Sequence, residues 1–503
     1  MTDSSAKRIP YYKNVISGIG VLIFLIAALN IAFLVMIEMS STHENPYVGI
    51  MAYAVIPGFL VFGLLLFVFG MIRERRRRRR MHDSDMGWYP VIDFNNPRHL
   101  RNFFLTICFT VIFFSISILG SYKAFHYTES DAFCGTLCHE IMHPEYTAYK
   151  LSPHAKVGCV GCHVGEGANW YVKSKLSGAY QLYATARNIY PRPVQSPVEN
   201  LRPAQETCES CHWPEKFWGA QLKVFNHFGY DETNTPRETQ MLIKVGGGRA
   251  TGSKSGGIHY HMNIDNEITY VPADRQHQII PYVKVRSKKT GKVTEYYLQG
   301  DGAMTPEQVA GAKAKKMDCV GCHNRPTHIY WAPDQSVDQA LLSNAIDRSI
   351  PYIKAQAVDV LDDEYKTTDE AVGSIKQKLE KYYSENYPEL MQKDRAKLDQ
   401  AVKATQAIFT QTIFPEMRVN WKVHPNNLGH LYSAGCFRCH DNQHASKDGR
   451  VLSKDCNLCH NVLRQQEGGR MMIETPDSVF VHPVDLGDMQ EMVCTDCHSG
   501  STM

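Results

Sequence analysis

Seven pairs of cysteines in this chain are each followed directly by a histidine. Six pairs have the spacing C-x-x-C-H, and the first, CGTLCH, has one extra residue between its cysteines. Two thiols at this spacing can add to the two vinyl groups of a haem, and the imidazole that follows is placed to bind the iron. The pattern therefore predicts seven covalently bound c-type haems. The sites are Cys134–Cys138–His139, Cys159–Cys162–His163, Cys208–Cys211–His212, Cys319–Cys322–His323, Cys436–Cys439–His440, Cys456–Cys459–His460 and Cys494–Cys497–His498.

Paired cysteines also form zinc ribbons and disulfide frameworks. Neither alternative requires a histidine directly after every pair, and here all seven pairs have one. The motifs use 14 of the 15 cysteines, and the remaining one, Cys108, lies in an apolar run where a small buried side chain is expected. We therefore interpret the chain as a multihaem cytochrome c.

A low-spin electron-transfer haem needs a second axial ligand, usually histidine or methionine. Residues 122–503 hold twelve histidines outside the motifs, which is more than seven irons can use. Positions 259 and 261 alternate on an expected strand, so both side chains would point the same way. The sequence does not assign individual histidines to individual haems. The candidates are His154, His227, His259, His261, His328, His430, His444 and His482, together with Met142, which could equally be a buried side chain.

The chain must also position these motifs relative to a membrane. Three apolar stretches, residues 15–39, 48–72 and 103–121, reach the length of about 20 residues that a spanning helix needs. An arginine run, Arg73–Arg80, follows the second stretch, and such basic loops stay in the cytoplasm. This predicts a multi-pass bacterial inner-membrane protein with a cytoplasmic N-terminus, an uncleaved signal-anchor, and all haem motifs in the periplasm.

The charge balance agrees with this placement. Residues 1–121 hold 12 of the 54 Lys and Arg and 7 of the 51 Asp and Glu, which leaves 42 against 44 in residues 122–503. The outer region is thus slightly acidic before haem propionates are added. The overall charge of +3 comes from the arginine run, whose position beside a span favours topology over nucleic-acid binding, so nucleic acid is not an expected partner.

The expected fold class is a membrane-anchored multihaem cytochrome c with three N-terminal transmembrane helices. A largely irregular and α-helical, haem-packed periplasmic region follows, with a small β insertion and a helical segment. Residues 240–245, 257–263, 280–286 and 293–298 are strand-like, with KKTGK at 288–292 as a hairpin turn. Apparent capping boxes at Ser336 and Thr367 predict helices after them, including 371–384 and 391–410. The expected domains are 1–121 (transmembrane), 122–235 (three haems), 236–333 (β insertion and fourth haem), 334–415 (helical scaffold) and 416–503 (three haems).

Residues 134–219 resemble the NapC/NirT family of membrane-anchored quinol dehydrogenases. The resemblance lies in CHEIMHPEY, SPHAKVGCVGCHVGEGANWYVKSK and LRPAQETCESCHWPEKFWG. It implies menaquinol oxidation beside the first haem, with Met142 as an iron ligand, Lys173 or Lys175 beside the quinol, and His154 on a more distant haem. The chain departs from the family pattern in the extra residue of CGTLCH, in the position of Met142, and in two additional spans.

Residues 169–190 interleave aromatic side chains with Lys173, Lys175 and Arg187, a composition that suits a helix lying in the membrane interface. Quinol oxidation releases protons, so a base is expected nearby. That stretch has no carboxylate, and Glu140, Glu145 and Glu166 are the nearest candidates; Glu140 is taken with Lys173 and Lys175 as the tentative quinol site.

The whole organisation is similar to the seven-haem inner-membrane cytochromes of metal-reducing bacteria. We therefore expect a menaquinol dehydrogenase that passes electrons through seven haems to periplasmic c-type cytochromes, for extracellular respiration. Its partners would be the quinone pool and these carriers, in a homo-oligomer or a membrane complex. The alternatives are a periplasmic terminal reductase with an open haem position and an electron-transfer subunit of a larger complex. A C-x-x-C-K motif, typical of multihaem nitrite reductases, does not occur.

Overall fold

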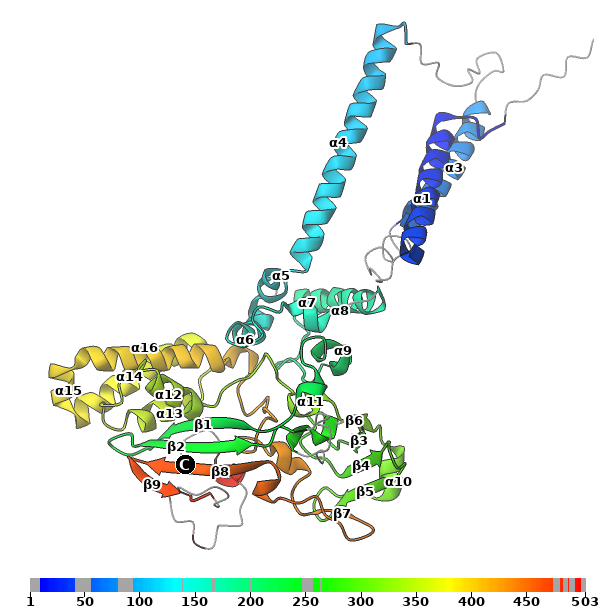
Figure 1. Cartoon of the computed structure of the whole chain (residues 1–503). Helices are drawn as coiled ribbons and strands as arrows, with labels where there is room; N and C mark the ends of the chain where they lie inside the picture. Colours follow the sequence, from blue (N-terminus) through cyan, green and yellow to red (C-terminus); the bar gives the residue numbers. More distant parts are fainter. Residues whose placement is uncertain are drawn as a thin grey trace, which may run out of the picture. The chain divides into compact units, whose positions relative to one another are not determined.

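The computed structural model describes residues 10–40, 56–79, 94–137, 139–164, 168–198, 201–246, 257–262, 265–473, 480–482, 487 and 494–498 (Figure 1). The chain divides into two compact units. One comprises Met1–Ser130 with His163–Tyr183, and the other comprises Asp131–Cys162 with Ala184–Met503.

In the first unit, helices α1 (Val15–Ser40) and α3 (Ile56–Arg78) pack against each other along their length (Figure 1). Small residues permit this close approach. A Cβ on Gly20 would lie 2.5 Å from the backbone nitrogen of Phe67, and one on Gly63 would lie 2.8 Å from the carbonyl oxygen of Gly20. The two backbones therefore touch, as is common for paired helices in membranes.

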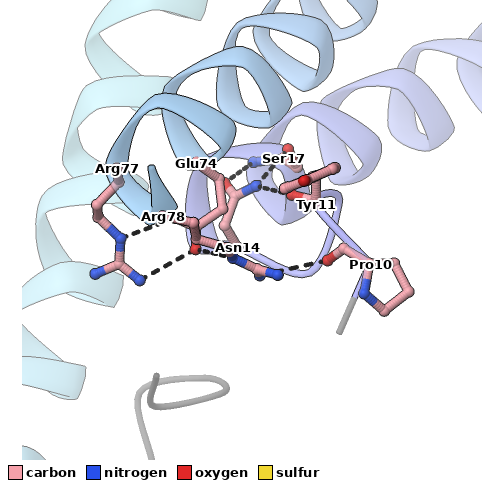
Figure 2. Close-up of polar contacts among 7 residues, drawn as sticks. All are labelled: Pro10, Tyr11, Asn14, Ser17, Glu74, Arg77 and Arg78. Carbon is pink, nitrogen blue, oxygen red and sulfur yellow. Dashed lines mark hydrogen bonds and ion pairs between the residues drawn. The ribbon is translucent and has the colours of Figure 1, made fainter. Parts of the chain in front are cut away.

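A polar cluster joins the start of α1 to the end of α3, as Figure 2 shows. The buried carboxylate of Glu74 accepts hydrogen bonds from Arg77 Nε at 3.0 Å and Arg78 Nε at 2.8 Å. Arg78 also donates to the carbonyl of Pro10 at 3.5 Å and lies 5.4 Å from the ring centre of Tyr11. The N-terminal segment and the arginine run thus lie at the same end of the helix pair.

The expected count of three spans is corrected to two within the described residues. Residues Val15–Ala32 of α1 and Ile56–Arg78 of α3 are long and apolar enough to cross a membrane. A helix does form at the third position, α4 (Pro97–Thr128), but it begins with Arg98, His99 and Arg101, and many side chains of its apolar part (106, 109–111, 113–122) lie outside the described residues. It therefore does not count as a span here.

The expected interface helix is present as α8 (Ala168–Ala186). Its side chains Leu176, Tyr180 and Tyr183 are all more than half exposed, so the helix presents a large apolar surface. This is what an interfacial helix needs, although a membrane is not part of the structure.

Two antiparallel sheets form the β part of the second unit (Figure 1). The first has the order β1-β2-β8-β9: β1 (Gln221–Phe228), β2 (Pro236–Ile243), β8 (His460–Glu467) and β9 (Arg470–Ile473). The second has the order β6-β3-β4-β5-β7: β6 (Lys315–Lys316), β3 (Asn266–Val271), β4 (Tyr282–Ser287), β5 (Val293–Leu298) and β7 (His444–Ser446). Each sheet takes strands from the expected insertion and from the C-terminal haem segment, so the β structure is larger than a small insertion.

The β4–β5 hairpin confirms the expected turn at 288–292, with Ser287 and Lys292 closing the ladder. The expected strand at 257–263 is wrong. These residues form a short 3-10 helix, η4 (Ile258–Met262). The residue before it, Gly257, has a φ of +86°, and a Cβ at this position would lie 2.4 Å from the Lys244 carbonyl oxygen, so glycine is required. Backbone bonds from Ile258 and His259 to Lys244 and Val245 hold this turn beside the end of β2.

The expected helical segment is present and has a core of side chains alone. Its helices are α12 (Pro333–Leu342), α13 (Ile353–Asp362), α14 (Thr368–Asn386), α15 (Pro388–Lys393) and α16 (Arg395–Thr412). Leu379, Leu398 and Phe409 are fully buried between them. Thr367 caps α14 as expected, by accepting a hydrogen bond from the Glu370 amide. The cap expected at Ser336 is wrong, because α12 already begins at Pro333.

Short helical turns carry the cysteine motifs. They are α5 (Asp131–Thr136), α7 (Cys159–His163), α9 (Ala204–Cys208), α11 (Cys319–Cys322), η6 (Gly435–Arg438), η7 (Cys456–Leu458) and α17 (Cys494–Cys497). The remaining helices are α6 (His139–Lys150), η3 (Pro214–Lys216), α10 (Pro306–Gly311) and η5 (Pro415–Met417). A helical turn brings residues three apart onto one side, which suits the attachment of both thiols to one haem.

Candidate haem-iron sites

Five motif histidines each face a second histidine from elsewhere in the chain. An iron held by two imidazoles needs ring centres about 6.2 Å apart, from two bonds of about 2.0 Å plus about 1.1 Å within each ring. The observed separations of the ring centres agree with this value, so the residues fit a six-coordinate haem iron. The pairs are His154 with His212 (6.1 Å), His259 with His323 (6.5 Å), His261 with His440 (5.9 Å), His430 with His460 (6.1 Å) and His482 with His498 (6.0 Å).

Hydrogen bonds hold several of these rings in the tautomer that iron needs. Nδ1 of His154 lies 3.2 Å from the Pro326 carbonyl oxygen, and Nδ1 of His259 lies 3.1 Å from that of Val245. A carbonyl can only accept, so Nδ1 carries the proton and Nε2 keeps its lone pair. Burial lowers the pKa of His259 below its ordinary value, which also favours the neutral ring.

The turn η4 places one histidine opposite each of two different motif histidines. His259 faces His323 of the fourth motif, and His261 faces His440 of the fifth. The expectation that both side chains point the same way is wrong, because a 3-10 helix turns about 120° per residue and sends residues two apart in different directions. One turn therefore ties two neighbouring iron sites together.

His444 does not fit the role of a ligand that the sequence predicts for it. Its ring is fully buried, and Nδ1 lies 2.9 Å from Asp441 Oδ1 while Nε2 lies 2.6 Å from the Ile280 carbonyl oxygen. Both ring nitrogens lie at hydrogen-bond distance from protein oxygens, so neither is directed at an iron. We interpret His444 as a structural residue that ties β7 to the chain before β4.

His227 likewise bonds a carboxylate in the described part of the chain. Its Nδ1 lies 3.0 Å from Oδ2 of the buried Asp338, whose Oδ1 lies 2.6 Å from Lys354 Nζ. The structure does not bring His227 to axial distance of a described motif histidine. Asp338 therefore orients the His227 ring without an iron.

His328 belongs to a buried charged cluster. Its Nδ1 lies 2.9 Å from the Glu145 carbonyl oxygen, and the Glu145 carboxylate accepts both bonds from Arg325 Nη2 at 3.2 Å. Burial alone would raise the pKa of Glu145, but the nearby charge of Arg325 holds it below its usual range. Glu145 is therefore a paired anion that fixes the His328 ring with Nε2 as its acceptor nitrogen.

The attachment cysteines of successive motifs lie close together. The Cys134 thiol raises the pKa of Cys159, and the Cys319 thiol raises that of Cys208, on which Cys162 also acts. Burial and then the Cys436 thiol raise the pKa of Cys322 and of Cys459 to about 11. Each of the first six motifs thus has an attachment cysteine that interacts with one of a neighbouring motif.

A cavity of about 330 Å³ lies beside the first motif. Leu137, which stands between the two cysteines of that motif, lines it together with Glu140, Asn188, Tyr190 and Arg192. Arg192 Nη2 donates to the Tyr190 hydroxyl at 2.6 Å and to Glu140 Oε1 at 3.3 Å. The cavity therefore combines a carboxylate, a phenol and a cation, which is a suitable set for binding and deprotonating a hydroxylated ring.

The sequence predicts Glu140 at such a site but gives no signal for Arg192, which follows the aromatic helix and belongs to no motif. Lys173 lies in the other compact unit, where it is exposed, with Nζ 5.0 Å from the ring centre of Trp170. Met142 follows His139 by three residues on α6, so the two positions share one helix face and would approach an iron from the same side. Cys138 and Glu166 lie outside the described residues, as do the side chains of His139, Lys175 and Cys494.

Comparisons with known proteins agree with the sequence-based resemblance. Residues 97–212 match the NapC/NirT cytochrome c family, N-terminal region, and residues 430–503 match the cytochrome c3 family. The chain is 44% identical over 498 residues to the cytochrome c-type protein ImcH of Geobacter sulfurreducens, a match that covers 98% of this chain and 96% of the relative. No solved structure matches significantly. The resemblance to the NapC/NirT family and to inner-membrane cytochromes of metal-reducing bacteria is confirmed.

Proposed function

Because the chain belongs to the ImcH type of NapC/NirT multihaem cytochromes, which are inner-membrane electron-transfer proteins, we propose that it oxidises menaquinol and passes the electrons outward to a periplasmic carrier. The electrons would travel through seven covalently bound c-type haems and serve extracellular respiration. Each bound haem supplies a one-electron redox centre whose potential depends on its axial ligands and surroundings.

The observation that carries this proposal is the pairing of histidines at motifs three to seven. In each pair, two imidazoles stand at the separation that one iron requires, as in His261 with His440 at 5.9 Å. Two such histidines would hold both axial positions of a bound haem iron and would leave it no open position for a substrate. This supports electron transfer over the alternative of a terminal reductase.

The first two motifs complete the proposed set. Within the described residues, His328 is a further histidine whose Nδ1 is bonded to a carbonyl, so we propose it as a distal ligand without assigning it to one motif. At the first motif, His139 and Met142 would compete for one face of the iron. That leaves the opposite face to another group or to the quinol site.

We place menaquinol in the cavity beside the first motif. Glu140 would accept a proton from the quinol hydroxyl, and Arg192, bonded to Glu140 and Tyr190, would orient that carboxylate and stabilise the deprotonated ring oxygen. Lys173 and Lys175 on the aromatic helix α8 are the further candidates for contact with the quinol ring or with lipid phosphates.

The α1–α3 pair would anchor the chain in the membrane. Arg78 and Pro10 lie at the same end of this pair, which would be the cytoplasmic end. The chain after α4 (Pro97–Thr128) carries the haem motifs, which we place in the periplasm.

The test uses detergent-solubilised holoprotein and a reduced menaquinone analogue. Glu140→Gln and Arg192→Gln should each slow haem reduction by the quinol at least about tenfold, because a positioned general base contributes about 10²–10⁴. The matched control is Glu206→Gln, which removes the similar exposed pair with Arg202. Pyridine haemochrome counts check that each variant is fully loaded. Unchanged rates in both cavity variants would move the quinol site elsewhere.

A further inference from the structure

The fifth and sixth motifs differ in what holds their paired imidazoles. At the fifth, Nδ1 of His261 lies 2.9 Å from the Ile258 carbonyl oxygen, and Nδ1 of His440 lies 2.9 Å from that of Ser453. At the sixth, Nδ1 of His430 and of His460 are both buried and have no hydrogen-bond partner within the described residues. Within the described residues, the fifth site therefore has two imidazoles bonded to carbonyls of other residues, and the sixth has none.

This difference acts on the iron. An imidazole that donates its N–H to a carbonyl is a more basic ligand, because the bond shifts electron density onto the other ring nitrogen. A more basic ligand stabilises the oxidised iron more than the reduced iron and lowers its reduction potential. At the fifth site, both His261 and His440 donate to a carbonyl, so both ligands would lower the reduction potential of the iron.

Charged side chains lie near both motifs. At the fifth motif, the Arg438 charge lowers the pKa of both Cys436 and Cys439, and Asp441 opposes it at Cys439. At the sixth motif, Lys244 acts on both Cys459 and His460 and donates to the carbonyl of Asn457, which lies between the two attachment cysteines.

A second lysine lies between the two sites. Lys454 Nζ lies 5.4 Å from the ring centre of Phe437, which belongs to the fifth motif and stacks on His430 with centres 4.4 Å apart. Lys454 therefore does not distinguish the two sites, and Asp455, which bonds the Asn457 amide, offsets part of the positive charge at the sixth. The charge that acts on the sixth motif alone is that of Lys244, which favours the reduced state of its iron.

We infer that the iron of the sixth motif has a higher reduction potential than the iron of the fifth, so that an electron reaching the fifth site moves on to the sixth and is held there. In this step the fifth iron is oxidised from Fe(II) to Fe(III) as the sixth is reduced from Fe(III) to Fe(II). The inference rests on the proposed haem loading of both motifs. We expect the electron to prefer the sixth site at least tenfold, a difference of about 59 mV for one electron.

The test is a potentiometric titration of solubilised holoprotein with dithionite as reductant, followed by EPR. The ring planes meet at 87° in the fifth site and at 22° in the sixth, so the two oxidised irons give different low-spin signals. His261→Met and His430→Met each remove one signal and so assign it. The signal lost in His430→Met should disappear at the higher potential in the unmodified protein; equal or reversed midpoints would overturn the inference.

A second experiment leaves the histidine ligands unchanged, so it remains informative if the ligand variants do not fold. Lys244→Gln should lower the midpoint of one near-parallel signal and leave the near-perpendicular signals unchanged. Lys288→Gln in the β4–β5 turn is the charge-matched control and should shift neither. No shift in Lys244→Gln would contradict the electrostatic part. Because dithionite supplies the electrons, these outcomes do not depend on quinol oxidation.

Discussion

The imidazole rings of His259 and His323 lie 6.5 Å apart and within 5° of parallel. His261, only two residues after His259, meets its own partner His440 at 87°. A single 3-10 turn therefore holds one ligand of a near-parallel iron site and one ligand of a near-perpendicular site.

These angles predict the EPR spectrum of the oxidised protein. Parallel ligand planes split the iron d orbitals strongly and give rhombic low-spin signals, whereas perpendicular planes leave two orbitals nearly equal and give highly anisotropic signals. The pairs His259–His323 at 5° and His430–His460 at 22° should give rhombic signals. The pairs His154–His212 at 68° and His261–His440 at 87° should give highly anisotropic signals. Low-temperature EPR of the holoprotein measures both classes. A spectrum of one class alone would contradict the ring geometry.

Removing a distal ligand should open an iron position only where the structure places a ligand. His261→Ala should convert about one haem per molecule to a high-spin form that binds carbon monoxide. His444→Asn is the contrast, because both nitrogens of His444 are already bonded to protein oxygens. It should create no carbon monoxide site but should lower stability by about 1–3 kcal/mol through the unpaired carboxylate and carbonyl. Optical titration with carbon monoxide and thermal unfolding distinguish the two. A carbon monoxide site in His444→Asn would restore it as a ligand.

Acid stability should depend on His277. Burial and then the Lys315 charge lower the pKa of His277 to about 4, against about 6.5 in an unfolded chain. Between these values the unfolded chain binds a proton that the folded chain does not, so this contribution is complete above about pH 6.5 and is lost as the pH falls towards 4. Tyr270, Asp274 and Arg438 also face this ring.

The matching variant is His277→Asn, since asparagine tolerates the φ of +57° at this position. The fall in Tm between pH 6.5 and 4.5 should shrink by about 2–4 °C, the shift that ~1 kcal/mol gives in a large domain. Thermal unfolding followed by circular dichroism across that range is the measurement. An unchanged pH profile would show that His277 is not a proton-linked group.

Topology reporters test the sidedness of the chain. Alkaline phosphatase is active only outside the cytoplasm, so a fusion after Arg79 should be inactive and a fusion after Ser130 should be active. A fusion within residues 41–55 serves as the control for the outer side. Equal activity at Arg79 and Ser130 would contradict the periplasmic placement of the haem region.

The sequence predicted what local spacing encodes. The seven motifs, the helix pair α1 and α3, the aromatic helix α8, the β4–β5 hairpin and the Thr367 cap each follow from residues within a few positions of one another. Long-range partners could not be predicted in this way. The pairing of His430 with His460 and the exclusion of His444 depend on contacts such as Ile280 with His444, which are 164 residues apart.

The turn at 258–262 shows why local patterning also fails. Alternating His259 and His261 is typical of a strand, but Gly257 and the bonds to Lys244 and Val245 impose a 3-10 turn instead. Similarly, Arg192 lines the cavity and contacts Tyr190 and Glu140, and no sequence motif predicts these contacts.

Anaerobic stopped-flow absorbance tests whether electrons enter this protein from menaquinol. Detergent-solubilised holoprotein is mixed with an excess of a reduced menaquinone analogue, and haem reduction is followed in time. If the chain oxidises menaquinol itself, several haems should be reduced rapidly without any added protein. If the haems stay oxidised with quinol but are reduced by dithionite, the chain does not oxidise quinol itself, and the electrons must come from a separate subunit.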